Sequence, residues 1–330
     1  MSETGDYDPG PWAGYDFNSM RKKYDAHVGR SYADATHANV AASNLTPSKI
    51  TTESTCPLVI ACDVTGSMGD WPATIFSKLP YLDLEGKEYL GEDFQISFAA
   101  VGDLHSDKYP IQVREFVSGK ALETELQKLI IEGQGGGQTC ESYEATAYYY
   151  ANCVEMSNAI KPIFIFIGDE NIYGILYHDD ISKYLNNVDK SNFKDGKVFT
   201  DELIQSLKKK FSVYIIRKPY GGGELDTTNL EIQHNWERLL GADHVCILPE
   251  ASRVVDVIFG ILAKETGRID YFKKEIVDRQ NPDQVATVMK SLVSIHKIGY
   301  DKNEDKDEDV TKSVTRRTNS KNLTNSKSLL

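Results

Sequence analysis

Short apolar runs alternate with amphipathic segments through the middle of the chain. The runs cover residues 57–62, 94–102, 111–117, 161–168, 211–217 and 244–249, and several are almost free of polar residues. Strands that helices cover on both faces have this composition. The segments between them have the length and composition typical of helices, at residues 71–90, 120–131, 141–157, 201–210 and 229–240. The alternation predicts an α/β fold with a doubly wound, mostly parallel sheet flanked by helices.

The two ends of the chain differ from this central part. Residues 1–54 are polar, with one helical stretch at 17–28, and predict an N-terminal arm that packs on the following domain. Residues 299–330 have too little apolar content to fold and predict a disordered polar tail. The central domain then covers residues 55–298. It includes two further amphipathic segments, which we expect to pack on the sheet, with partner binding as the alternative. They are residues 251–278 and 283–298.

Composition and charge narrow the class of protein. The 330 residues are 40% hydrophobic and 26% charged, which is enough for a soluble globular protein with a real core. Neither a membrane-spanning run nor a signal peptide is evident, so we expect a cytoplasmic location. The net charge of −12 argues against nucleic acid and anionic membranes as partners. The five scattered cysteines form no CxxC pair and predict reduced thiols.

An aspartate and two hydroxyl residues follow the first apolar run at fixed spacing. Asp63, Thr65 and Ser67 alternate along the chain, so three oxygen-bearing side chains can converge on one point. Mg²⁺ takes oxygen ligands in near-octahedral geometry and needs few protein carboxylates. The three residues therefore predict a site for a hard divalent cation. The alternative is that Thr65 or Ser67 caps the helix that begins near Trp71.

Two more loops lead to the same edge of the predicted sheet. Asp169 follows the fourth apolar run, and ligands of doubly wound folds bind at the carboxyl ends of the strands. In the other loop, three glycines at 135–137 precede Thr139 and Glu141 at a helix start. A phosphate-binding loop needs a Lys before the hydroxyl residue, where this chain has Gln138. The glycine loop therefore favours a metal site over a phosphate site.

From about residue 57 to 250 the chain resembles a von Willebrand factor A domain, which has a Rossmann-like fold. That family builds a metal-ion-dependent adhesion site from three loops. They supply a DxSxS motif after the first strand, a Thr or acidic residue in a second loop, and an Asp after the fourth strand. The motif has a Thr here in place of its usual first Ser, which preserves the hydroxyl. The matching residues are Asp63, Thr65 and Ser67, then Thr139 or Glu141, then Asp169.

The middle loop decides what such a site can do. The run GGGQTCES resembles a branch whose loop reads GGGDxPE, in which the glutamate, here Glu141, approaches the metal. Ligation by Glu141 would bring up to three carboxylates to the ion and weaken its demand for a further anion. Ligation by Thr139 would leave the metal more electrophilic; we favour Glu141. Asp103 and Asp107 resemble a feature of uncharacterised bacterial and phage members, and either back the metal ligands or form a solvated turn.

These features predict a metal-dependent protein-binding module. Mg²⁺, with Mn²⁺ and Ca²⁺ as alternatives, would bind the residues above, and its open coordination position would receive an acidic residue of a partner protein. The resemblance implies an AAA+ ATPase as one candidate partner. The sequence contains no evident pair of nucleophile and base, so catalysis is the less favoured prediction. The alternatives are a metal-dependent hydrolase and a scaffold with an unoccupied metal site.

Overall fold

A six-stranded sheet forms the centre of the molecule. The computed structural model describes residues 40–69, 71–126, 128–130, 139–220 and 226–296. The strand order is β13–β12–β8–β3–β4–β5, and all neighbours are parallel except β4 and β5. The predicted fold class, a mostly parallel sheet flanked by helices, is confirmed. The strands are β3 (Leu58–Asp63), β4 (Ile96–Val101), β5 (Ile111–Val113), β8 (Ile163–Gly168), β12 (Ser212–Arg217) and β13 (Val245–Ile247).

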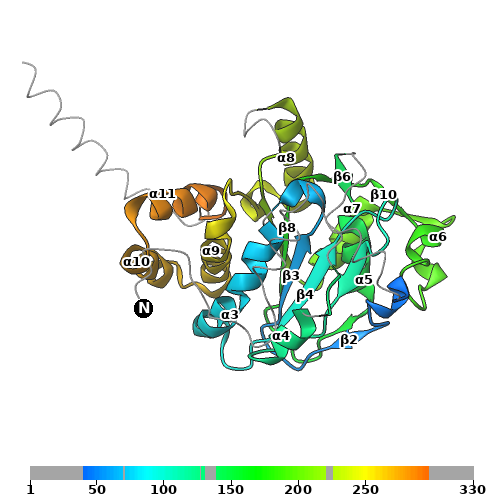
Figure 1. The fold of residues 1–330 in the computed structure, drawn as a ribbon, viewed down its shortest axis with the longest axis horizontal. Coiled ribbons are helices and arrows are strands. Elements are labelled where there is room, and N and C mark those ends of the chain that lie inside the picture. Colours follow the sequence, from blue (N-terminus) through cyan, green and yellow to red (C-terminus); the bar gives the residue numbers. More distant parts are fainter. Residues whose placement is uncertain (1–39, 70, 127, 131–138, 221–225, 297–330) are drawn as a thin grey trace, which may run out of the picture. The chain divides into compact units, whose positions relative to one another are not determined.

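Alternate residues of β3 enter two hydrophobic cores on opposite faces of the sheet. Leu58, Ile60 and Cys62 lie in one core, and Val59 and Ala61 lie in the other. This alternation is the two-residue period of a strand, and it explains why the whole run had to be apolar. Helices cover both faces (Figure 1). They are α3 (Trp71–Leu90), α4 (Ala121–Leu126) and α9 (Val254–Thr266) on the first face, and α5 (Tyr143–Asn152), α7 (Thr200–Lys208) and α8 (Thr227–Leu240) on the second.

The order of the strands reverses between β3 and β8. From β3 the chain continues to β4 on one side, whereas β8 is followed by β12 and β13 on the other. Cys62 pairs with Ile167, so the carboxyl ends of β3 and β8 lie next to each other. In a doubly wound sheet, this switch point is where ligands bind. The fold therefore places the residues that follow β3 and β8, including Asp169, at the expected binding edge.

The amphipathic segment at 251–278 forms two helices, α9 and most of α10 (Ile269–Arg279). α9 ends at Thr266 because Gly267 has a left-handed conformation (φ 69°), which terminates helices. α10 follows, and then α11 (Pro282–Ser291), with Asn281 as its N-cap. α12 (Val293–His296) ends the described chain.

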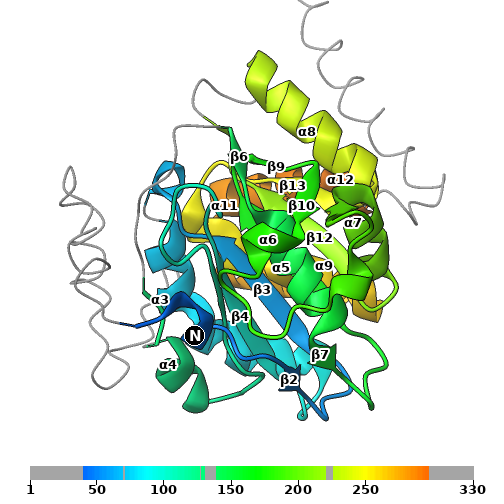
Figure 2. The same cartoon turned by 90° about the vertical axis from the view of Figure 1, so that its right-hand side faces the viewer.

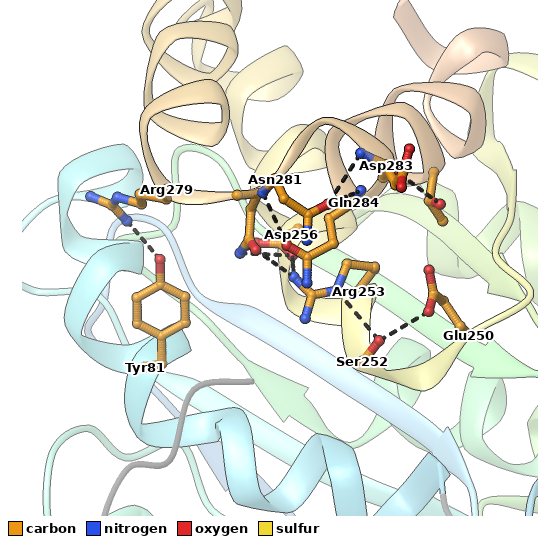
Figure 3. Close-up of polar contacts among 11 residues, drawn as sticks. Tyr81, Glu250, Ser252, Arg253, Asp256, Arg279, Asn281, Asp283 and Gln284 are labelled. Carbon is orange, nitrogen blue, oxygen red and sulfur yellow. Dashed lines mark hydrogen bonds and ion pairs between the residues drawn. The ribbon is translucent and has the colours of Figure 1, made fainter. Parts of the chain in front are cut away.

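These C-terminal helices pack on the core, as one of the two sequence interpretations expected. Leu292 lies so close to Gly260 of α9 that a Cβ there would be 2.2 Å from it. Figure 3 shows the polar contacts that join the helices. Arg253, almost fully buried, donates to Asp256 at 3.1 Å, and Arg279 donates to the hydroxyl of Tyr81 in α3 at 2.6 Å.

Short elements that the sequence pattern did not reveal lie at both ends of the sheet: Figure 2 shows β6 and β9 near the top, and β2 and β7 at the bottom. Strands of two or three residues are too short for a periodic pattern. β6 pairs in parallel with β9, β10 pairs antiparallel with β11, and β2 pairs in parallel with β7. They are β2 (Ile50–Thr51), β6 (Cys140–Glu141), β7 (Val154–Glu155), β9 (Asn171–Ile172), β10 (Ile175–Tyr177), β11 (Lys197–Phe199) and the one-turn helix α6 (His178–Ile181).

Both ends of the chain fall largely outside the described residues. The chain divides into two units, Met1–Ile295 and His296–Leu330. The predicted helix at 17–28 and the predicted tail at 299–330 lie outside the described part. Of the N-terminal arm, β2 is described, and it attaches to β7. Among the described residues, no helix combines the length and apolar character needed to cross a membrane.

Candidate metal centre

Asp63 ends β3 with its carboxylate fully buried. Thr65 donates to Asp63 Oδ1 through its backbone N–H at 2.8 Å and through its hydroxyl at 2.6 Å. The hydroxyl of Tyr143 donates to Asp63 Oδ2 at 2.8 Å. A short 3₁₀ turn, Gly66–Met68, begins after Thr65, whose side chain makes no capping hydrogen bond. The Thr65 hydroxyl therefore serves the carboxylate and not a helix start.

Ser67 connects this loop to Asp169. Its hydroxyl donates to Asp169 Oδ1 at 2.9 Å and lies 3.4 Å from the hydroxyl of Thr65. Asp169 directly follows β8, the sheet neighbour of β3. The structure thus joins four of the six predicted ligands in one chain of contacts, running from Asp63 through the two hydroxyls to Asp169.

The two candidates in the middle loop differ in their surroundings. Pairing of β6 with β9 fixes this loop beyond the end of β8, and Asn171 donates to the backbone carbonyl of Thr139 at 3.0 Å. Thr139 is exposed, whereas Glu141 is buried. Burial, and next the charge of Asp63, raise the pKa of Glu141 to about 11. Of the two candidates, only Glu141 is therefore buried and influenced by the charge of Asp63, whereas Thr139 lies in solvent.

Burial and mutual repulsion raise the pKa of further carboxyls in the centre. Burial and then the charge of Asp169 raise the pKa of Asp63 to about 7, although hydrogen bonds from Thr65 and Tyr143 lower it. Burial, Asp169 and Asp63 raise the pKa of Glu170 to about 8. Among the described residues, Oε2 of Glu170 has no hydrogen-bond partner, and the same is true of Glu141 Oε2. A cation bound here would relieve this excess of negative charge.

Lys218, which was not among the predicted site residues, places a positive charge beside Asp169. Its ammonium donates to Asp169 Oδ2 at 3.1 Å and also to the backbone carbonyl of Ser67. The backbone N–H of Lys218 donates to the carbonyl of Gly168 at 2.9 Å, which extends the pairing of β12 with β8 by one residue. The available signal was its position directly after an apolar run, at the same sheet edge as Asp169.

Tyr143 and Gly168 fit together beside Asp63. A Cβ on Gly168 would lie 1.8 Å from the Tyr143 hydroxyl oxygen, so only glycine leaves room for this tyrosine. The Tyr143 ring packs edge-on against Phe166 and Trp236, with centroid distances of 5.8 and 5.3 Å. Neither residue has a distinctive sequence pattern, because their contact joins segments far apart in the chain.

Asp103 and Asp107 do not form a solvated turn, since both are buried. Asp107 Oδ2 accepts a hydrogen bond from the backbone N–H of Asp103 at 2.8 Å. The hydroxyl of Ser142 joins this loop to the start of α5. It accepts a hydrogen bond from the backbone N–H of Leu104 at 2.9 Å and donates to Asp103 Oδ1 at 3.4 Å. The loop thus supports the residue that follows Glu141.

The donor set of the centre fits a hard divalent cation. No three His, Cys, Asp or Glu side chains in the described ranges are arranged to hold a metal ion. The predicted centre does not depend on such a group, because two of its donors are hydroxyls. Two buried carboxylates with two hydroxyls between them are oxygen ligands of the kind that Mg²⁺ takes while it keeps several waters. The residues that would hold it are Asp63, Thr65, Ser67 and Asp169.

Comparisons with known proteins identify similar solved structures but no family. No family model matches the chain, and no curated protein matches its sequence. The pilus adhesin SpaC of Lactobacillus rhamnosus GG matches over 69% of this chain and 32% of its own, at 13% identity and a TM-score of 0.46. Its open conformation matches over 69% and 31%, at 11% identity and a TM-score of 0.46.

A von Willebrand factor type A protein from Catenulispora acidiphila is a further similar structure. It matches over 65% of this chain and 43% of its own, at 16% identity and a TM-score of 0.40. The chain therefore spans less than half of the length of each of these three structures.

Proposed function

We propose that this protein is a metal-dependent protein-binding module of the von Willebrand factor A type. Asp63, Thr65, Ser67 and Asp169 hold Mg²⁺, or Mn²⁺ or Ca²⁺ in its place, in a metal-ion-dependent adhesion site. The observation that carries this proposal is the continuous set of contacts from Asp63 through the two hydroxyls to Asp169. Such an arrangement of oxygen donors, located at the switch point of the sheet, suits a hard cation.

The cation links the protein to its partner through an acidic side chain. Ser67 is partly exposed, whereas Asp63, Thr65 and Asp169 are buried, so a partner's Asp or Glu approaches from the side of Ser67. Of the two residues in the middle loop we favour Glu141, which is buried while Thr139 is exposed, and we place it behind the four ligands and not on the ion itself. The partner is a protein; an AAA+ ATPase remains a candidate on the resemblance in sequence alone.

Calorimetric titration with Mg²⁺ and Mn²⁺ tests the metal site. The wild type should bind one equivalent, and Asp63→Asn should lose at least ten-fold in affinity because a carboxylate is removed from the centre. Asp179→Asn is the matched control: it removes the same charge from a side chain that is 98% exposed. Absence of binding by the wild type would leave only a scaffold with an unoccupied site.

Partner capture is tested separately from metal binding. Proteins retained by the wild type in Mg²⁺ should be released by EDTA, should not be retained by Asp63→Asn, and should be retained by Asp179→Asn. A partner peptide from such a protein should lose binding when its acidic residues become amides. Metal binding together with metal-dependent turnover of a hydrolysable substrate would favour a hydrolase instead.

A further inference from the structure

Lys218 lies where a divalent cation would act on Asp169. The side chain of Asp169 is 1% exposed and that of Lys218 is 22% exposed, so this ion pair is largely shielded from water. The same ammonium contacts the backbone carbonyl of Ser67, in the loop that follows β3. A single amine therefore joins the loop after β3 to the loop after β8 without any metal.

Strand register explains why this lysine and not the adjacent arginine reaches the centre. Arg217 pairs with Gly168, and successive side chains of a strand point to opposite faces. Arg217 donates to the backbone carbonyl of Asn229 in α8 at 2.9 Å. The next residue, Lys218, therefore points to the face on which Asp169 and Ser67 lie.

We propose that Lys218 is a built-in counter-cation, which neutralises Asp169 while the centre is metal-free and which a divalent ion must displace in order to bind. The inference rests on the proposed function, since it concerns the same centre. An ammonium and a divalent ion that both contact the Asp169 carboxylate would repel each other strongly. Lys218 therefore lowers the affinity for metal and, at the same time, stabilises the metal-free fold by offsetting the repulsion between buried carboxylates.

This dual role predicts two effects of opposite sign for one substitution. Lys218→Met should bind Mn²⁺ about ten-fold more tightly than the wild type, because no ammonium has to be displaced. The same variant should melt at a lower temperature in EDTA, because Asp169 loses its counter-charge. A purely structural lysine would give only the second effect. Lys218→Arg retains the charge and should stay close to the wild type in Mn²⁺ affinity.

The titration measures free Mn²⁺ by electron paramagnetic resonance, and melting is recorded on separate samples of the same proteins in EDTA. Lys183→Met is the control, since Lys183 forms an exposed ion pair with Asp180 and should change neither quantity. Tighter Mn²⁺ binding by Lys218→Met than by the wild type supports the inference. Binding by Lys218→Met alone, with none by the wild type, supports it as well. If the wild type binds Mn²⁺ and Lys218→Met binds it equally or more weakly, this inference is overturned and the proposed function is not. No binding by either protein overturns the proposed function with it.

A measurement on the wild type covers the case in which Lys218→Met fails to fold. Lysines are acylated briefly with an N-hydroxysuccinimide ester, and modification of Lys218 is followed by mass spectrometry. Mg²⁺ should increase the acylation rate of Lys218 several-fold over EDTA, because displacement frees the amine, and should leave Lys183 unchanged. In Asp63→Asn this response should be lost. An acylation rate of Lys218 that is the same with Mg²⁺ and with EDTA would overturn the inference.

Discussion

The hydroxyl of Tyr143 donates a 2.8 Å hydrogen bond to the buried carboxylate of Asp63. Both side chains are fully buried, so the tyrosine orients the aspartate from the protein side while Thr65 orients it from the loop. Both carboxylate oxygens of Asp63 thus accept hydrogen bonds that hold the side chain in a fixed orientation at the candidate centre. This preorganisation comes from packing within α5 and β8, and its consequences can be tested without a metal.

Tyr143→Phe should lower the free energy of unfolding by about 1–3 kcal/mol. The substitution leaves Asp63 Oδ2 buried without its donor, and an unsatisfied buried acceptor costs that amount. Urea denaturation in EDTA measures the change. Tyr177→Phe removes a hydroxyl from a residue that is 48% exposed and should shift stability by less than about 0.5 kcal/mol. Equal, small effects for both variants would show that the Tyr143 hydrogen bond has no stabilising role.

Gly168→Ala should be strongly destabilising, by about 2 kcal/mol or more, because the new methyl group would overlap the Tyr143 hydroxyl. Gly174→Ala is the control, since nothing lies within 4 Å of a Cβ there. Combining Gly168→Ala with Tyr143→Phe removes the overlapping oxygen, so the double variant should lose less stability than the sum of the single variants. Additive losses would mean that residue 168 is constrained by something other than this contact.

Metal-free stability should fall as pH rises from about 4 to about 7. The folded pKa of Asp63 is raised from 3.8 to about 7, so over this range the folded state binds more protons than the unfolded state. Stability present at low pH is therefore lost as pH passes from the unfolded to the folded pKa, by about 1.4 kcal/mol per pH unit for one proton. Urea titrations in EDTA across this range measure the slope.

Substitution of the aspartate identifies its share of that slope. Asp63→Asn should be less steep than the wild type between pH 4 and 7, while the exposed-site variant Asp179→Asn should keep the wild-type slope. Glu170 extends the decline toward pH 8, because its pKa is raised to about 8. A stability that rises with pH over this range in EDTA would be incompatible with the raised pKa of Asp63.

The middle position of the centre is tested by comparing two variants. Glu141→Gln should weaken Mn²⁺ binding about ten-fold, because a buried carboxylate that interacts with the charge of Asp63 is lost. Thr139→Ala should leave the affinity within about two-fold, since this residue is exposed. Calorimetric titration measures both affinities. The reverse order of effects would assign the position to Thr139 and leave the metal more electrophilic.

The sequence predicted the sheet and the two aspartates for the same reason. Long apolar runs mark the buried strands, and Asp63 and Asp169 are polar residues at the carboxyl ends of two of them. Lys218 stands in an equivalent place after β12, but a lysine after a strand has no distinctive pattern, and its contact with Asp169 depends on which strands are neighbours.

Other features had no local signal. The contact between Tyr143 and Gly168 depends on the packing of α5 against β8, which composition does not encode. The choice between Thr139 and Glu141 depends on β6, a strand of two residues that is too short for a periodic pattern. The break between α9 and α10, by contrast, has a local signal, because Gly267 is a helix-ending glycine within the amphipathic segment at 251–278.

An anomalous difference map, collected near the manganese edge from crystals grown with Mn²⁺, tests directly whether the centre binds a divalent cation. We expect one strong peak at metal–oxygen bonding distance from the hydroxyls of Thr65 and Ser67, with the Lys218 ammonium moved away from Asp169. The same map from Asp63→Asn crystals should have a much weaker peak. A wild-type map without a peak at these hydroxyls, or with the only peak elsewhere, would rule out the proposed metal site.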